Sequence, residues 1–121
     1  RGYSNGISAQ GRMVFVAGQI GWNSKCVFET DLFWKQTRQA LYNTVEVLSA
    51  AEAKPEQIVR MTWFITSRKE YLEQQKEIGK AYREIIGKHY PAMSVLVVSE
   101  LIEEAAKVEI ETTAVIPEIP R

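Results

Sequence analysis

Two glutamates near the C-terminus carry the clearest candidate chemistry in the sequence. Glu109 and Glu111 occur in the segment VEIETTAV, and a strand would direct both carboxylates to the same face of a sheet. A carboxylate held on a strand can bind water or an amine and act as a general base or acid. The more common alternative for such a pair is a hydrated strand end, or a salt bridge to Lys107 or Arg60. Tyr3 adds a phenol without an evident core role, in an opening turn.

The sequence offers few other candidate catalytic or metal-binding residues. His89 and Cys26 are the only histidine and cysteine, and because no motif pairs them we expect a solvated turn histidine and an inert thiol. This shortage argues against a transition-metal site, and the acidic residues lack calcium-loop spacing. The GQIG segment at residues 18–21 lacks phosphate-loop spacing, so its glycines are expected to permit a bulge or a close backbone approach. We therefore expect no metal or cofactor.

Composition narrows the classes of partner. The 121 residues contain 15 Lys and Arg against 15 Asp and Glu, which gives no broad basic surface for nucleic acid or an anionic membrane. No apolar stretch approaches the roughly 18 residues of a membrane span. A single cysteine fits a reducing compartment. We expect one domain over residues 1–121, a cytoplasmic location, no membrane partner and no nucleic-acid partner.

The sequence predicts the element order β-β-α-β-α-β-β, in the α+β class, and these elements must position the candidate residues. Strands are predicted at 7–9, 13–17, 58–66, 93–98 and 107–115, and helices at about 31–53 and 69–86. Asp31 is expected to cap the first helix and Lys54-Pro55 to end it, whereas Gly87 should follow the second. The apolar run from Met93 to Val98 predicts a strand covered on both faces.

Two helices of this size can cover only one face of such a sheet. The strands nevertheless carry apolar residues at alternate positions that leave both faces substantially apolar, namely Phe15, Phe64, Val95 and Val97. An uncovered apolar face tends to pack against copies of the same chain. The sequence therefore predicts a homo-oligomer.

Four segments together resemble the YjgF/RidA family, also called the L-PSP endoribonuclease family. They are VFVAGQIG, QTRQALYNTVEVLSAAEAKPEQIVRMTWFIT, AYREIIGKHYPAMSVLVV and VEIETTAV, collinear from about Tyr3 to Val115. The resemblance implies a fold like chorismate mutase of the bacillary type, in which three copies form a barrel with clefts between subunits. The best-known subfamily hydrolyses reactive enamines and imines to keto acids and ammonia without a cofactor. Other relatives have been described as ribonucleases or translation inhibitors.

The resemblance assigns roles to two residues, and at three other positions this chain departs from the family's pattern. Tyr3, in GYSN, falls on the tyrosine of PYSQ that lines the cleft, and Glu109 falls on the carboxylate that positions the attacking water. Met93 stands where the deaminase subfamily has the arginine of PARS, which clamps a substrate carboxylate. Val95 stands in place of a cysteine and Gly79 in place of an asparagine.

Without that clamp, a carboxylate substrate should lose roughly several kcal/mol of binding. We expect a more apolar ligand, with cleft walls formed by Met93, Val95, Phe15 and Trp22. If carboxylate imines are processed, another cation such as Arg60 or Arg12 must reach the cleft.

Three functions follow from these residues. The first is an atypical family member that hydrolyses a small enamine, imine or related metabolite in the clefts of a homotrimer, with Glu109 activating water and Tyr3 donating a hydrogen bond. The alternative is a non-catalytic trimer that binds a small ligand or a partner protein. A ribonuclease comes third, because zero net charge provides no broad basic surface for RNA and a single histidine provides no pair for acid–base cleavage.

Overall fold

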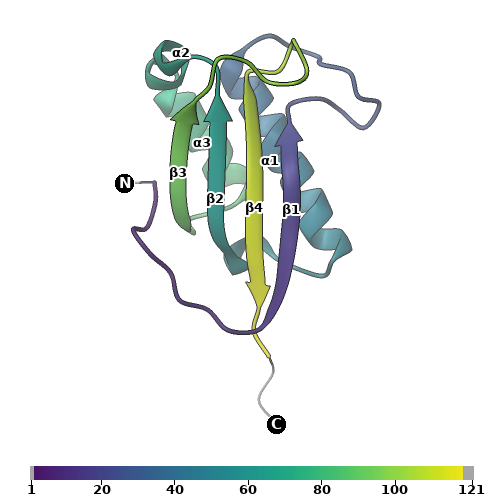
Figure 1. Cartoon of the computed structure of the whole chain (residues 1–121), viewed down its shortest axis with the longest axis vertical. Coiled ribbons are helices and arrows are strands. Elements are labelled where there is room, and N and C mark those ends of the chain that lie inside the picture. Colours follow the sequence, from purple (N-terminus) through teal and green to yellow (C-terminus); the bar gives the residue numbers. More distant parts are fainter. Residues whose placement is uncertain (1, 119–121) are drawn as a thin grey trace.

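A four-stranded mixed sheet with all the described helices on one side forms the framework. The computed structural model describes residues 2–118. The strands are β1 (Arg12–Ile20), β2 (Ile58–Ile65), β3 (Ala92–Val97) and β4 (Val108–Ile116). The helices are α1 (Phe33–Ala50), the short 3₁₀ helix η1 (Pro55–Gln57), α2 (Arg68–Glu73) and α3 (Gln75–Ile85). The α+β class is confirmed; in Figure 1, α1 and α3 lie behind the sheet and α2 lies beyond the ends of β2 and β3.

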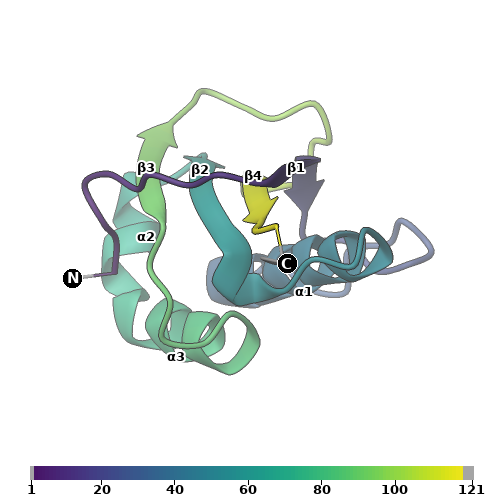
Figure 2. The same cartoon turned by 90° about the horizontal axis from the view of Figure 1, so that it is seen from below.

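The strand order is β1-β4-β2-β3, which puts the C-terminal strand in the centre. β4 pairs antiparallel with both β1 and β2, whereas β2 and β3 are parallel. The parallel pair is joined through α2 and α3, as a crossover connection requires. Figure 2 shows the helices beneath the sheet and none of them above it. We call this uncovered side the open face; it displays Phe15, Arg60, Thr62, Glu109 and Glu111.

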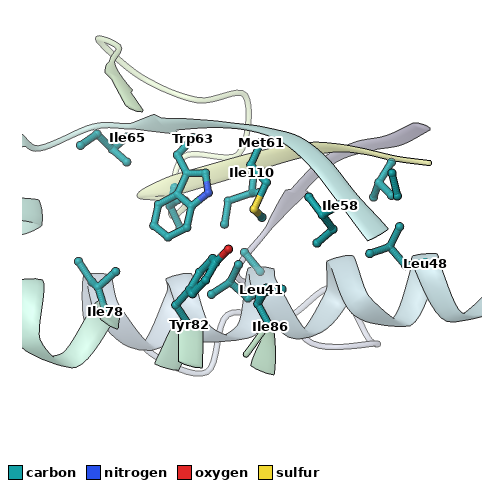
Figure 3. Packing of buried hydrophobic residues seen from close by; sticks show 14 of the residues in the cluster. Leu41, Leu48, Ile58, Met61, Trp63, Ile65, Ile78, Tyr82, Ile86 and Ile110 are labelled. Atoms are coloured by element: carbon teal, nitrogen blue, oxygen red, sulfur yellow. The ribbon is translucent and has the colours of Figure 1, made fainter. Parts of the chain in front are cut away.

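The core fills the space between the sheet and the helices. Alternate residues of β2 and β4 are buried there, among them Met61, Trp63, Ile65 and Ile110, as strand periodicity predicts. α1 contributes buried residues at helical spacing and α3 contributes a stripe that includes Ile78 and Tyr82. Figure 3 shows these side chains converging between the two layers. The sheet and the helices therefore bury apolar faces against each other.

The predicted order was wrong at the N-terminus and within the second helix. Residues 7–9 form no strand; the opening segment makes one isolated bridge, between Ser4 and Ala92. The helix expected over residues 69–86 is divided at Gln74, whose backbone leaves helical geometry at φ −106° and ψ 19°. Gly87 follows α3 with a φ of +96°, which confirms its predicted position beyond the helix end.

The start of α1 is capped from a distance. Asp31 does not cap it: the N-cap residue is Leu32, which offers no side-chain hydrogen bond. Instead, Gln74 Oε1 accepts a hydrogen bond from the Trp34 backbone N–H, 2.9 Å away. The break between α2 and α3 thus supplies an acceptor that α1 lacks locally. At the other end, α1 stops at Ala50, before the predicted end near residue 53, and Glu52 takes a left-handed φ of 65°.

β3 is an edge strand rather than a strand covered on both faces. In the described chain β2 is its one strand neighbour, apart from the single bridge between Ala92 and Ser4, and Leu96 and Val97 are 45% and 55% exposed. Val95 packs against the core on the helix side, so Leu96, not Val95, is the apolar residue that β3 adds to the open face. The prediction of a strand covered on both faces was wrong, because the helices cover only one side of the sheet.

The described residues, 2–118, contain no helix that is both long enough and apolar enough to cross a membrane. They also contain no group of three or more His, Cys, Asp or Glu side chains that could hold a metal ion.

Gln36 ties α1 to two loops that lead into the sheet. Its side chain is fully buried, and Nε2 donates to the carbonyl oxygens of Thr30 at 3.1 Å and Ala105 at 3.0 Å. Its Oε1 accepts from the Lys107 backbone N–H at 2.8 Å, immediately before β4. The amide therefore satisfies buried backbone groups of both loops at once.

Gln36→Ala should lower the free energy of unfolding by about 2–4 kcal/mol, because it leaves buried backbone groups without partners. Gln39→Ala is the matched control: Gln39 is half-buried on the same helix and makes one side-chain bond, to Asn43. It should cost about 1 kcal/mol or less. Urea unfolding at fixed protein concentration measures both. Equal costs would contradict the role assigned to Gln36.

Candidate functional site

Glu109 is held where β1 departs from regular pairing. The register of β1 against β4 shifts between Val16 and Gln19, as expected for a bulge. This brings the Gly18 backbone against the Glu109 side chain, and a Cβ on Gly18 would lie 2.7 Å from Glu109 Cδ. The predicted close approach at the GQIG segment is therefore confirmed. Across β2, Phe64 is the register partner of Glu109.

Neither strand glutamate forms a salt bridge within residues 2–118. Lys107 Nζ contacts Glu70 Oε2 at 3.0 Å instead, so it does not neutralise Glu109. Arg60 and Glu111 share a shallow hollow of about 380 Å³ on the open face, together with Phe15, yet make no ion pair there. The salt-bridge alternative considered for Glu109 and Glu111 is thus wrong in this chain.

A second hollow lies on the helix side, between α3 and strands β2 and β3. This α3 cavity has a volume of about 360 Å³, in the range of small-ligand sites. Its lining residues are Gly2, Trp63, Tyr71, Gln75, Ile78, Gly79, Tyr82, Arg83, Tyr90 and Met93. Two predicted binding residues, Met93 and Gly79, therefore line the same cavity.

Tyr82 forms the floor of the α3 cavity as a permanently neutral phenol. Its hydroxyl donates to the His89 carbonyl oxygen at 2.5 Å, and its ring stacks on that of Tyr90 with centroids 5.7 Å apart. Burial, with a smaller contribution from Tyr90, raises the pKa of Tyr82 far above its ordinary value. His89 Nε2 lies 2.6 Å from the Ile58 carbonyl oxygen. The expectation of a solvated His89 was wrong, because the turn folds back onto the start of β2.

Arg83 is the functional candidate that sequence reasoning missed. It lines the α3 cavity beside Gly79, where an added Cβ would lie 3.1 Å from Arg83 Nη1. The two are four residues apart on α3, so the glycine leaves a gap into which Arg83 can lean; that spacing was the available signal. The cations proposed instead lie elsewhere: Arg12 donates to the Ala51 carbonyl oxygen at 3.2 Å, and Arg60 is on the open face.

Tyr3 is carried by a segment that is fastened to the start of β3. Ser4 Oγ donates to the Tyr90 carbonyl oxygen at 2.6 Å, and Ser4 N–H donates to that of Pro91 at 2.9 Å. Gly2, on the other side of Tyr3, lines the α3 cavity. Tyr3 itself is 45% exposed. The opening segment is therefore located at the rim of the cavity that contains Met93.

The remaining predicted residues lie elsewhere in the chain. Phe15 is 70% exposed on the open face, and Val95 packs against the core. Trp22 is half-buried in the loop after β1, tilted against Phe28 with ring centroids 5.9 Å apart. Most importantly, Met93 packs on the helix side of the sheet, whereas Glu109 lies on the open face. One chain alone does not bring the predicted catalytic and binding residues together.

A family model covers nearly the whole chain. The model described as Endoribonuclease L-PSP matches residues 1–116. The chain therefore belongs to the YjgF/RidA/L-PSP family, and its α+β, chorismate mutase-like fold is the one predicted.

Three similar proteins illustrate the range of the family. The chain is 33% identical over 113 residues to a RutC family protein of Aquifex aeolicus, covering 93% of this chain and 87% of that protein. It is 30% identical to a 2-iminobutanoate/2-iminopropanoate deaminase of Dermatophagoides farinae, covering 94% and 85%. Among solved structures, it resembles Escherichia coli TdcF with bound serine, with a TM-score of 0.73, 30% identity and coverage of 94% and 87%.

The contact between Gly18 and Glu109 can be tested without any assay of function. Gly18→Ala should cost about 1 kcal/mol of unfolding free energy, because the new methyl group must push the end of the Glu109 side chain aside. In a Glu109→Ala background the same change should cost about 0.5 kcal/mol or less, a coupling that a double-mutant cycle measures. Gly6→Ala, in open space, is the control. A Gly18→Ala cost that does not depend on residue 109 would refute the contact.

Proposed function

We propose that this chain hydrolyses a small enamine or imine, with Glu109 as the residue that activates water. The supporting observation is a strand carboxylate without an ion pair in the described residues, fixed by the backbone at Gly18. The similarity to a named imine deaminase supports the same reaction. A general base needs such a carboxylate, held in place and available to a water molecule.

The reaction needs only water and proton transfers. An enamine first tautomerises to the imine. Water then adds its oxygen to the carbon of the protonated imine while Glu109 takes one proton, which leaves a neutral carbinolamine. Glu109 returns the proton to the amine nitrogen. The carbon–nitrogen bond then breaks as the hydroxyl group gives its proton to water, and ammonia and a carbonyl product leave. In this scheme the Tyr3 hydroxyl donates a hydrogen bond to the reacting group.

The proposed site is completed by neighbouring copies in a homotrimer. Glu109 and Met93 lie on opposite sides of one sheet, so a site that uses both must take one of them from another chain. The open face has the apolar surface for such contacts, since Met13, Phe15 and Leu96 are 54%, 70% and 45% exposed. A trimer with clefts between subunits is the arrangement that the family resemblance implies.

Sedimentation should give a single species of three chains. Phe15→Glu should dissociate it, because a charge would be buried in the contact. The matched control is Tyr42→Glu, which changes an aromatic residue, 52% exposed, on α1 behind the sheet. This control should remain a trimer. A wild-type protein that stays monomeric at micromolar concentration would remove the trimer and the shared site with it.

Glu109→Gln should lower the rate of imine hydrolysis by roughly 10²–10⁴-fold, the usual contribution of a general base. Ammonia release from freshly generated 2-iminobutanoate, and from an imine without a carboxylate, measures the rate. Glu111→Gln is the matched control, since it removes the next carboxylate on the same face of β4. It should retain activity. Wild-type activity in Glu109→Gln would refute the assigned role.

The second candidate is a non-catalytic protein that binds a small ligand. Met93, in the position of the family's clamping arginine, favours it, as does the serine found in Escherichia coli TdcF. This function is correct if no imine or enamine in a broad panel is turned over while a ligand still raises the melting temperature. An endoribonuclease has less support, because the formal net charge is zero and the single histidine is engaged with a backbone carbonyl.

A further inference from the structure

Arg60 and Glu111 are opposite charges without partners on the open face. Both side chains are exposed, and neither forms an ion pair in the part of the chain that the structure describes. Arg60 is the register partner of Thr113, and Glu111 precedes Thr113 by two residues on the same face of β4. The two charged residues are therefore diagonal neighbours, with Cα atoms about 7–8 Å apart. Both line the shallow hollow of about 380 Å³ described above.

The open face, which no helix covers in Figure 2, has apolar edges and a charged centre. Its exposed apolar residues lie on the two outer strands, Met13 and Phe15 on β1 and Leu96 on β3. Arg60 and Glu111 lie on β2 and β4, the two inner strands. In a closed ring of three identical copies, each chain contacts its two neighbours with two different surfaces. The two apolar edges provide these surfaces, so the inner strands of all three copies face the axis of the ring.

We propose that Arg60 of each copy forms an ion pair with Glu111 of the next copy, so that the two charges alternate around the axis. The inference rests on the homotrimer of the proposed function, and it names the contact that orients the copies. Near the axis each residue approaches its counterparts in the other two copies. Arginines alone or glutamates alone would repel one another there, whereas equal numbers of both give a ring without net charge. A guanidinium also binds a carboxylate with two parallel hydrogen bonds, which fixes the geometry of the contact.

The same ion pair separates the roles of the two glutamates on β4. Glu111 is the carboxylate nearer Arg60, whereas Glu109 is four residues from Thr113, or roughly 13 Å along the strand. The charged ring therefore uses Glu111 and leaves Glu109 without a cation. A carboxylate beside a cation loses basicity, because the positive charge favours its ionised form. Pairing Arg60 with Glu111 thus keeps Glu109 available as the proposed base.

Charge reversal on the full chain tests the ring by sedimentation equilibrium. Arg60→Glu leaves only carboxylates around the axis and Glu111→Arg only guanidinium groups, so each should raise the concentration for half-assembly at least about 100-fold. The double variant Arg60→Glu/Glu111→Arg restores opposite charges and should assemble within about tenfold of wild type. Lys80→Glu is the matched control, because it makes the same change of charge on an exposed residue of α3. It should assemble as wild type does. Glu111→Gln keeps an oxygen that accepts from Arg60, and should remain a trimer.

An equimolar mixture of Arg60→Glu and Glu111→Arg chains shows whether the pairs run between chains. In a mixed trimer two of the three contacts join opposite charges, so the mixture should assemble at concentrations where neither variant does alone. Pairs within one chain would gain nothing from mixing. The proposal is overturned if a stable trimer tolerates both reversals, if the mixture does not assemble, or if wild type is a monomer. Tolerated reversals in an active trimer would leave the hydrolase function standing, whereas the expected pairing in a trimer that turns over no imine would refute that function alone.

Discussion

The central position of β4 is the constraint on which the rest of the molecule depends. Because β4 pairs on both sides, its residues cannot slip by one position without turning the buried face outward. Val108 and Ile110 are fully buried under the helices, and this fixes Glu109 and Glu111 on the other side. The same pairing brings the bulge of β1 over Glu109. The position of the candidate base is thus a consequence of core packing.

Sequence periodicity could predict the features that depend on one element at a time. The alternation of β4, the buried stripe of α1 and the glycine beyond α3 were all available from residue order. The features that depend on two distant elements could not be predicted from residue order. Gln74 caps α1 across forty positions of sequence, and the exposure of β3 follows from helices that cover only one side of the sheet rather than from its own apolar run.

The candidate site also combines features of single elements, which the sequence could predict, with features that depend on two distant elements. Glu109 and Met93 could be singled out from the segments in which they occur, but their separation by the sheet could not. Arg83 and Trp63 belong to different elements, and their common cavity appears only once α3 packs against β2. The proposed site, which uses residues from the two faces of one sheet, would require more than one copy of the chain. The apolar surface of the open face and the incomplete site therefore support the same arrangement.

Met93, Gly79 and Arg83 are best understood as one physical set. A second guanidinium at position 93 would line the same cavity of about 360 Å³ as that of Arg83, and the two like charges would repel each other. A larger residue at position 79 would crowd Arg83 Nη1 out of its place. An apolar residue on β3, a glycine on α3 and an arginine one turn later are therefore mutually consistent.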